Sequence, residues 1–384
     1  MRFIHTSDLH IGKVVNGFSM LEEQRHALGQ ILRAVREHRA DAVFLSGDLY
    51  DRSIPPAAAV TVLDEFLTRL SDMGVKVYAI AGNHDCKERI GFASRILDRS
   101  GVYLEGTLSK DVRYADMETE NGLVRIHMIP YGKPAEIRAL YGVETSNYEE
   151  AMRELLSHVN YLEGGGNILL THQFVVNEGR EPELSDSETR VCVGGADQVE
   201  AANFYRFDYV ALGHIHGPQQ IGGLPVYYSG SPIKYSFSEV SHKKSVVLGV
   251  YEGPGRVSVT RLPLTPIHDM RRIRGRLADL TREDVVEAEG TDPEDYILAV
   301  LTDEEELIDP IGTLRSVYPN VMQLQIERKS ERQQEELVFA QNLKEKTPVQ
   351  LFEDFYGEVT GKELDEERRL VVKAAAEKAG EETR

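Results

Sequence analysis

Five short groups of aspartate, histidine and asparagine are the residues of this chain best suited to chemistry. They are Asp8-x-His10, Gly47-Asp48-x-x-Asp51, Gly82-Asn83-His84-Asp85, Thr171-His172 and Gly213-His214-x-His216. Taken singly, each group is also typical of a solvated loop or a tight turn, because Gly and Asp are favoured there. All five groups follow short runs of β-forming residues. This shared placement favours one common site over five unrelated turns.

The side-chain types indicate a site for two divalent metal ions. Carboxylate and amide oxygens mixed with imidazoles, without a thiolate, favour Mn, Fe or Mg over structural zinc. One aspartate can give an oxygen to each of two ions, which two-metal sites hold about 3.5–4 Å apart. Such a pair activates a shared water and stabilises the attacking and leaving oxygens of a phosphoryl displacement. Phosphoester hydrolysis is therefore the reaction that this set of residues serves best.

The strands that must position these groups are predicted at residues 2–6, 42–45, 75–80, 168–170 and 209–212. Between the early strands, residues 21–35 and 57–73 have the apolar spacing of amphipathic helices. Later apolar runs at 226–229, 245–250 and 257–262 indicate a β-meander. Ligand sites of open α/β sheets form beyond the carboxyl ends of the strands. The pattern predicts a layered α/β sandwich with parallel and antiparallel strand pairs.

The pattern changes near residue 265, which predicts a division into domains. Residues 1–265 are expected to form the domain that carries the site, and residues 266–330 a smaller α+β domain. A polar stretch at 331–344 is expected to be a linker. Residues 345–384 are rich in Glu, Lys, Ala and Leu and are expected to be helical.

Composition and charge exclude several classes of protein. The 44 basic and 63 acidic residues give a net charge of −19, which repels phosphate backbones and argues against a passive DNA coat. Bound metal ions can reverse the sign of the charge locally, so a nuclease stays open. No apolar run approaches the ~20 residues of a membrane span. Two cysteines, Cys86 and Cys192, cannot build a disulfide framework, and without a signal-peptide pattern a cytoplasmic location is expected.

In this order, the five groups resemble the motifs of the calcineurin-like metallophosphoesterases. Within that superfamily, the opening is similar to the SbcD family of nuclease subunits, on the segment His5-Thr6-Ser7-Asp8-Leu9-His10-Ile11-Gly12. The resemblance covers the first 265 residues strongly. It extends more loosely to Leu351-Phe352-Glu353-Asp354-Phe355-Tyr356. It implies mixed β-sheets flanked by helices, a small α+β capping domain that contacts DNA, and a helical C-terminal tail.

The same resemblance implies an activity and a role for each site residue. The activity is a 3′→5′ exonuclease on duplex ends and an endonuclease on single strands or hairpins, with Mn²⁺ expected and Mg²⁺ or Fe²⁺ as alternatives. One ion would be held by Asp8, His10, Asp48 and His216. The other would be held by Asp48, Asn83, His172 and His214.

The two catalytic candidates stand apart from these ligands. The resemblance keeps His84 off the metals, where it would stabilise the scissile phosphate or protonate the leaving oxygen. Asp85 would orient His84 or, equally, support its loop. Asp51 stands where relatives often carry His, and the resemblance assigns it no role.

The resemblance further implies three partners: DNA, a second copy of the chain, and an SbcC-type coiled-coil ATPase bound by the C-terminal helices. Residues 57–73 and 89–97 are the amphipathic candidates for a dimer contact. An apolar stripe in the tail would meet the ATPase, made by Leu351, Phe352, Phe355, Tyr356 and Val359. A local basic rim would hold DNA, made by Lys13, Arg52, Lys87, Arg89 and Arg95. A membrane partner is not expected.

Other classes of protein stay open on the residues alone. A phosphoprotein phosphatase is indicated by Gly47-Asp48-Leu49-Tyr50-Asp51-Arg52, which is similar to the Gly-Asp-x-x-Asp-Arg-Gly motif of those enzymes. Against this, Ser53, Ala81 and Asp85 stand where phosphatases have Gly, Arg and Glu. Another phosphodiesterase fits the metal residues but leaves the chain beyond residue 265 unexplained. A non-catalytic scaffold is disfavoured because every expected ligand is present.

Overall fold

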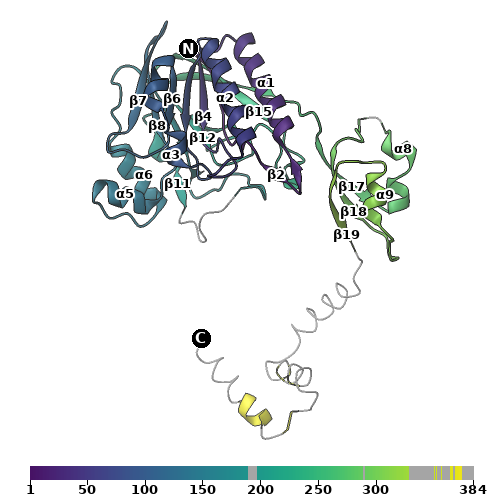
Figure 1. Cartoon of the computed structure of the whole chain (residues 1–384). Helices are drawn as coiled ribbons and strands as arrows, with labels where there is room; N and C mark the ends of the chain where they lie inside the picture. The colour runs from purple at the N-terminus through teal and green to yellow at the C-terminus, as the bar shows by residue number, and fades with distance from the viewer. Residues whose placement is uncertain are drawn as a thin grey trace. The chain divides into compact units, whose positions relative to one another are not determined.

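The computed structural model describes residues 1–188, 197–288 and 290–327, with residues 350, 352, 356, 364–365 and 368–373 near the C-terminus (Figure 1). Its contacts divide the chain into two compact units. The first comprises Met1–Val300 and Asp309–Gln325, and the second comprises Leu301–Ile308 and Ile326–Arg384. None of the described helices combines the length and the apolar character of a membrane span. The predicted linker and most of the predicted tail lie outside the described residues.

The first of two six-stranded sheets contains the strands that lead into the first three groups. Its order is β16 (Arg256–Pro263), β15 (Ser245–Gly253), β1 (Arg2–Thr6), β4 (Ala42–Ser46), β5 (Lys76–Ile80) and β6 (Val102–Glu105). Strands β1, β4, β5 and β6 are parallel, whereas β15 is antiparallel to β1 and to β16. The prediction of a sheet with both kinds of pairing is confirmed.

The second six-stranded sheet contains the strands that lead into the last two groups. Its order is β13 (Gln219–Gln220), β14 (Val226–Tyr228), β12 (Tyr209–Gly213), β9 (Gly166–His172), β8 (Gly122–Ile129) and β7 (Arg113–Thr119). The four central strands are parallel, and β13 and β7 pair antiparallel at the two edges. The parallel strands β9 and β12 therefore end side by side.

The predicted meander over three late strands is wrong. Strand β14 pairs with β12 in the second sheet, whereas β15 and β16 form an antiparallel hairpin in the first. The connection between β14 and β15 crosses from one sheet to the other and contains the short helix η3 (Phe237–Glu239). Short apolar runs carry no information about which sheet they join, so closeness in sequence was misleading here.

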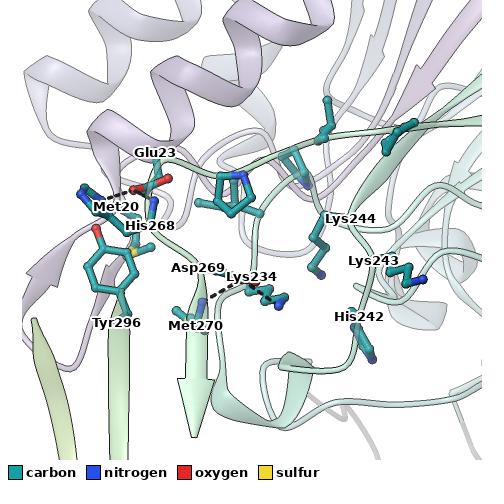
Figure 2. A pocket seen from close by; sticks show the side chains of 15 residues that line it. Met20, Glu23, Lys234, His242, Lys243, Lys244, His268, Asp269, Met270 and Tyr296 are labelled. Atoms are coloured by element: carbon teal, nitrogen blue, oxygen red, sulfur yellow. Dashed lines mark hydrogen bonds and ion pairs between the residues drawn. The ribbon is translucent and has the colours of Figure 1, made fainter. Parts of the chain in front are cut away.

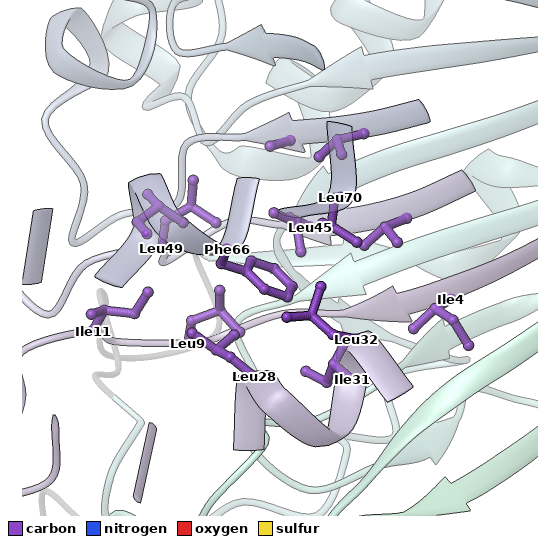
Figure 3. Packing of buried hydrophobic residues seen from close by; sticks show 14 of the residues in the cluster. Ile4, Leu9, Ile11, Leu28, Ile31, Leu32, Leu45, Leu49, Phe66 and Leu70 are labelled. Carbon is purple, nitrogen blue, oxygen red and sulfur yellow. The ribbon is translucent and has the colours of Figure 1, made fainter. Parts of the chain in front are cut away.

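Alternate residues of each strand pack on opposite sides of its sheet, as the strand pleat requires. Between the sheets, Phe3 and Phe44 lie with ring centroids 4.7 Å apart and join a cluster with Ile168, Leu170 and Ala211 of the second sheet. On the outer face, Ile4 and Leu45 belong to a second cluster with helix residues (Figure 3). The core is thus divided into an inter-sheet layer and two outer layers.

Helices cover the outer face of each sheet. The predicted helices are confirmed as α1 (Leu21–Glu37) and α2 (Ala57–Asp72), and Leu28, Ile31 and Phe66 from them pack on the first sheet (Figure 3). Helices α5 (Pro134–Tyr141) and α6 (Tyr148–Ser157) pack on the second sheet. Burying one such apolar side chain stabilises the fold by about 1.5–3 kcal/mol.

Shorter elements complete this domain. They are the strand pairs β2 (Val14–Val15) with β3 (Phe18–Ser19) and β10 (Phe174–Val176) with β11 (Gln198–Glu200), the helices α3 (Lys87–Ile90) and α4 (Ser94–Leu97), and the turns η1 (Asp98–Ser100) and η2 (Ala201–Phe204).

A three-stranded sheet follows residue 265. Its order is β17 (Met270–Gly275), β18 (Tyr296–Leu301) and β19 (Val321–Ile326), with short helices α7 (Leu277–Leu280), α8 (Glu283–Val286) and α9 (Pro310–Arg315). The predicted α+β character is confirmed, although the basic segment that forms β17 was not recognised as a strand. Met270, Tyr296 and Leu298 share a hydrophobic cluster with Met20 and Tyr235. The small sheet therefore packs directly on residues that neighbour the first group.

Candidate metal centre

The five groups meet at the carboxyl ends of five strands from both sheets. Strands β1, β4 and β5 are parallel neighbours in the first sheet, and β9 and β12 in the second. The loops that follow them are tied together, because the Asp8 amide donates to the Gly47 carbonyl at 3.1 Å and the His10 amide to the Asp48 carbonyl at 2.9 Å. The expected crevice is formed by strand ends of both sheets.

Four candidate ligands have a strained backbone. Asp8, His10, Asp48 and His214 have φ values of 52°, 42°, 50° and 104°. For residues other than glycine such conformations cost about 1–3 kcal/mol each and are found mainly at functional sites. The loop hydrogen bonds offset this cost and hold the side chains at the mouth of the sheet ends.

Three glycines allow the close approach of these loops. A Cβ atom on Gly47 would lie 2.3 Å from the His172 Nδ1, and one on Gly82 would lie 2.1 Å from an Asp48 carboxylate oxygen. A Cβ on Gly213 would lie 1.9 Å from the Ser46 carbonyl oxygen. The glycine that begins three of the five groups is therefore explained by space around the ligands.

One cluster of possible ligands consists of Asp8, His10 and His216, which are all buried. Their ligand atoms lie within 4.8 Å of one another, and the Nε2 atoms of His10 and His216 are 3.2 Å apart. Ligands about 2.1 Å from an octahedral ion lie about 3 Å from each other. The spacing of these imidazoles fits two ligands of one ion.

A second cluster surrounds Asp48. Its Oδ2 lies 3.4 Å from the His172 Nε2. The Asn83 Oδ1 lies 3.0 Å from the same Nε2 and 3.1 Å from the His214 Nδ1. Asp48 Oδ2 is also 3.7 Å from the His10 Nε2, so this carboxylate faces both clusters.

The electrostatics of this centre are those of carboxylates and imidazoles forced together without water. Burial raises the pKa of Asp48, but His172 and His10 hold it well below its usual range. Burial lowers the pKa of His172, but the Asp48 carboxylate outweighs burial and raises that pKa to about 9. Burial, together with the nearby His172, lowers the pKa of His214 to about 3. The His172 proton stands in for a positive charge that a metal ion would displace on binding.

His84 lies beside these clusters. Its Nδ1 donates to the Asp51 carbonyl at 2.9 Å, and its Nε2 is 4.0 Å from the Asp48 Oδ2. His10, Asp48 and His84 also form a group with ligand atoms within 4.8 Å. Distance therefore does not separate a metal ligand from a group that faces the phosphate, and the role of His84 stays a prediction.

Asp85 makes contacts that favour the loop-support alternative. Its carboxylate accepts backbone N–H groups of Leu49, Tyr50 and Gly82 at 2.9–3.0 Å. In the contacts described, Asp51 rather than Asp85 meets the His84 ring. Asp51 also pairs with Lys13 at 2.7 Å. The sequence motif contained both aspartates but carried no signal that exchanges their expected parts.

The predicted basic rim is partly neutralised. Lys13 pairs with Asp51, and Lys87 pairs with Glu136 at 2.5 Å. Arg52 is 60% exposed and lies 3.7 Å from Asp51. These cations add little net positive charge beside the ligands.

A separate cavity of about 250 Å³ lies where the small sheet meets the first domain (Figure 2). Its described lining includes Glu23, Lys244, His268 and Tyr296 but none of the five groups. Glu23 accepts from the His268 Nδ1 at 2.7 Å on one side of it. The metal candidates do not open into this cavity's lining.

Replacing Asp85 tests its contacts. Asp85→Ala should lower the free energy of unfolding by roughly 2–5 kcal/mol, because three buried N–H groups lose their acceptor. Urea denaturation with a chelator present measures this, with Asp72→Ala, at an exposed aspartate, as the control. Unchanged stability together with lost turnover would instead assign Asp85 to orienting His84.

Comparison with known proteins agrees with this geometry. The calcineurin-like phosphoesterase model matches residues 1–218, and the Type 5 capsule protein repressor C-terminal domain model matches residues 266–360. The chain is 30% identical over 328 residues to the SbcD subunit of nuclease SbcCD from Staphylococcus epidermidis, across 84% of this chain and 85% of that protein.

Two solved structures share features at low identity. A protein from Thermus thermophilus is 14% identical with a TM-score of 0.36, across 68% of this chain and 98% of that one. A dimetal phosphatase from Danio rerio is 12% identical with a TM-score of 0.38, across 69% of this chain and 99% of that one. The family models and the curated relative carry the assignment: this chain belongs to the calcineurin-like phosphoesterases and, among them, to the SbcD nuclease subunits.

Proposed function

We propose that this chain is the nuclease subunit of an SbcC–SbcD complex and cleaves DNA in the cytoplasm with two divalent metal ions, Mn²⁺ by preference. The single observation that carries the proposal is the buried Asp48 carboxylate, which faces His10 on one side and His172 on the other. The activity is that of a 3′→5′ exonuclease on duplex ends and an endonuclease on single strands or hairpins. The DNA-contacting role of residues 266–330 belongs to the same proposal.

The ligands divide around Asp48. Asp8, His10 and His216 would hold one ion and Asn83, His172 and His214 the other, with Asp48 shared. When bound, two such ions lower the pKa of a shared water and neutralise charge on the phosphate. The His172 Nδ1 donates to the Ser46 carbonyl at 2.8 Å, which leaves its Nε2 toward the centre. The ring is thereby oriented by the backbone of β4.

The contacts of His84 determine which proton it can give. A carbonyl only accepts, so the Nδ1 that meets the Asp51 carbonyl carries a proton. His84 can then donate from Nε2 only as an imidazolium, and Asp48 is close enough to stabilise that cation. A proton at Nε2 would pass to the leaving oxygen of the DNA strand.

A phosphoprotein phosphatase is the weaker candidate. Arg52, the residue that would grip a phosphate there, is mostly exposed and its nearest described partner is Asp51. The chain also continues for more than a hundred residues beyond the phosphoesterase match.

Two substitutions separate ligand from catalyst. Asp48→Asn should lose bound metal and cleavage together, because one charge serves both ions. His84→Ala should keep both ions and lower turnover by about 10²–10⁴-fold, the typical effect of a positioned acid. Both are measured on an end-labelled DNA hairpin with Mn²⁺ or Mg²⁺, alongside metal content, with a phosphopeptide as the rival substrate.

The matched control is His158→Ala, because His158 pairs with Glu154 outside the site. A His84→Ala protein that lost its ions would make His84 a ligand. Hydrolysis of the phosphopeptide in place of the hairpin would favour the phosphatase.

A second copy of the chain is the proposed partner of an exposed apolar patch. Phe92 is 79% exposed and Ile96 is 71% exposed, on and beside the short helix α4 within the predicted dimer segment 89–97. Val60 of α2 is exposed as well. Large exposed apolar side chains that gather on one segment are typical of interaction sites.

Sedimentation at micromolar concentration should give about twice the chain mass. Phe92→Ser combined with Ile96→Ser should shift it to one chain mass, whereas Tyr205→Ser, at a residue 83% exposed elsewhere, should not. A wild-type chain that sediments as a monomer would remove the dimer.

An SbcC-type ATPase is the proposed partner of residues 345–384. Most of the predicted stripe lies outside the described residues, while Phe352, Leu370 and Val371 are exposed. Deleting residues 345–384 should abolish co-purification with the ATPase and leave Mn²⁺-dependent cleavage of short single strands intact. Full-affinity binding by the truncated chain would refute this, and its unfolding would assign the tail to its own domain.

A further inference from the structure

His216 is held by three separate contacts on the side away from the ion site. Its Nδ1 lies 2.8 Å from the Ser187 Oγ. Its backbone N–H donates to the Glu188 carboxylate at 2.8 Å, and its carbonyl accepts from the Lys244 Nζ at 2.9 Å. Ring, amide and carbonyl are therefore all held.

The side chains of Ser187 and Lys244 converge on one buried carboxylate. Ser187 donates a short hydrogen bond to the Glu239 Oε1, and the Lys244 Nζ lies 2.5 Å from the Glu239 Oε2. Lys244 also donates to the Ser231 Oγ at 2.8 Å. An ammonium has three N–H donors, and the three contacts of Lys244 match that number.

This arrangement selects one tautomer of His216. The Ser187 hydroxyl gives its proton to Glu239, which leaves the Ser187 oxygen to accept from the His216 Nδ1. A proton on Nδ1 leaves the lone pair on Nε2, the atom that lies 3.2 Å from the His10 Nε2. Metal-binding histidines usually donate their second N–H to such a partner, which raises their basicity and fixes the ring.

Stability alone is a poor reason for burying this ion pair. Glu239 and Lys244 are almost fully buried, and the cost of taking both charges out of water commonly offsets their attraction. The pair does, however, place a carboxylate and an ammonium at fixed points on either side of His216. Lys244 reaches the same His216 carbonyl from the lining of the cavity in Figure 2.

We propose that Ser187, Glu239 and Lys244 are positioning residues that fix the tautomer and orientation of His216 and so set the affinity of one of the two ion sites. The inference rests on the assignment of His216 as a ligand under the proposed function. It adds residues that belong to none of the five groups and that touch neither DNA nor metal.

Calorimetric titration of the full-length, metal-stripped chain with Mn²⁺ tests the proposal without any cleavage assay. Ser187→Ala should weaken one of two binding events by about 10–100-fold and leave the other near the wild-type value. Ser187→Thr keeps the hydroxyl and should restore the wild-type affinity. Ser109→Ala is the matched control, since its hydroxyl donates only to the carbonyl of Asp111 in its own loop.

Glu239→Gln is the second variant, because it removes the charge but keeps the shape. It should weaken the same binding event, and melting of the metal-free protein reports any loss of stability. Ser187 is a partly exposed loop residue, so Ser187→Ala should melt within about 1–2 °C of wild type, as surface substitutions usually do.

The outcomes separate this inference from the function it rests on. A wild-type chain that binds fewer than two Mn²⁺ ions would overturn the metal assignment itself. Two-site binding by wild type with unchanged affinity in Ser187→Ala and Glu239→Gln would overturn only the positioning role. Weaker binding that tracks a lower melting temperature and is not restored by Ser187→Thr would make the network purely structural and also overturn the proposal.

Discussion

The burial of Asp48 between two sets of imidazoles is the interaction on which the rest of this structure depends. A carboxylate taken out of water is costly unless it is paired and hydrogen-bonded. Asp48 accepts the backbone N–H of His84 at 2.9 Å and lies within 4 Å of His10, His84 and His172. Asp8 is buried a short distance away and accepts the His214 N–H at 3.0 Å. Two carboxylates in such surroundings require positive charge, which divalent ions supply.

The two-sheet architecture follows from the need to bring that charge together. Neither sheet alone carries enough ligands: β1, β4 and β5 end in the three aspartate- and asparagine-bearing groups, and β9 and β12 end in the histidine pairs. The inter-sheet layer around Phe3 and Phe44 sets the distance between the strand ends. Glycines remove the side chains that would otherwise hold the loops apart. The strained φ values of four ligand candidates are tolerated because the loops are bonded to one another.

The acidic character of the whole chain gains a local explanation at this site. Cations near the ligands are mostly consumed by neighbouring carboxylates, as with Lys13 and Asp51 or Lys244 and Glu239. The positive charge that attracts a phosphate would therefore come chiefly from bound ions. Outside the centre, Arg272 on the edge strand β17 is exposed, whereas Arg271 pairs with Asp295 at 2.6 Å. A chain of net charge −19 can thus act on DNA without a basic surface of its own.

What the sequence determined by itself was the local part of this protein. An apolar run followed by Gly-Asp or Gly-Asn-His identifies a strand and its polar end, and helix spacing identified α1 and α2 to within two residues. Only the tertiary structure decided which sheet β14, β15 and β16 join, because short apolar runs look alike whichever neighbour they pair with. It also decided that Asp51, and not Asp85, meets the His84 ring. Ser187, Glu239 and Lys244 carried no motif at all, since residues 29 and 23 positions from His216 reach it only through the fold.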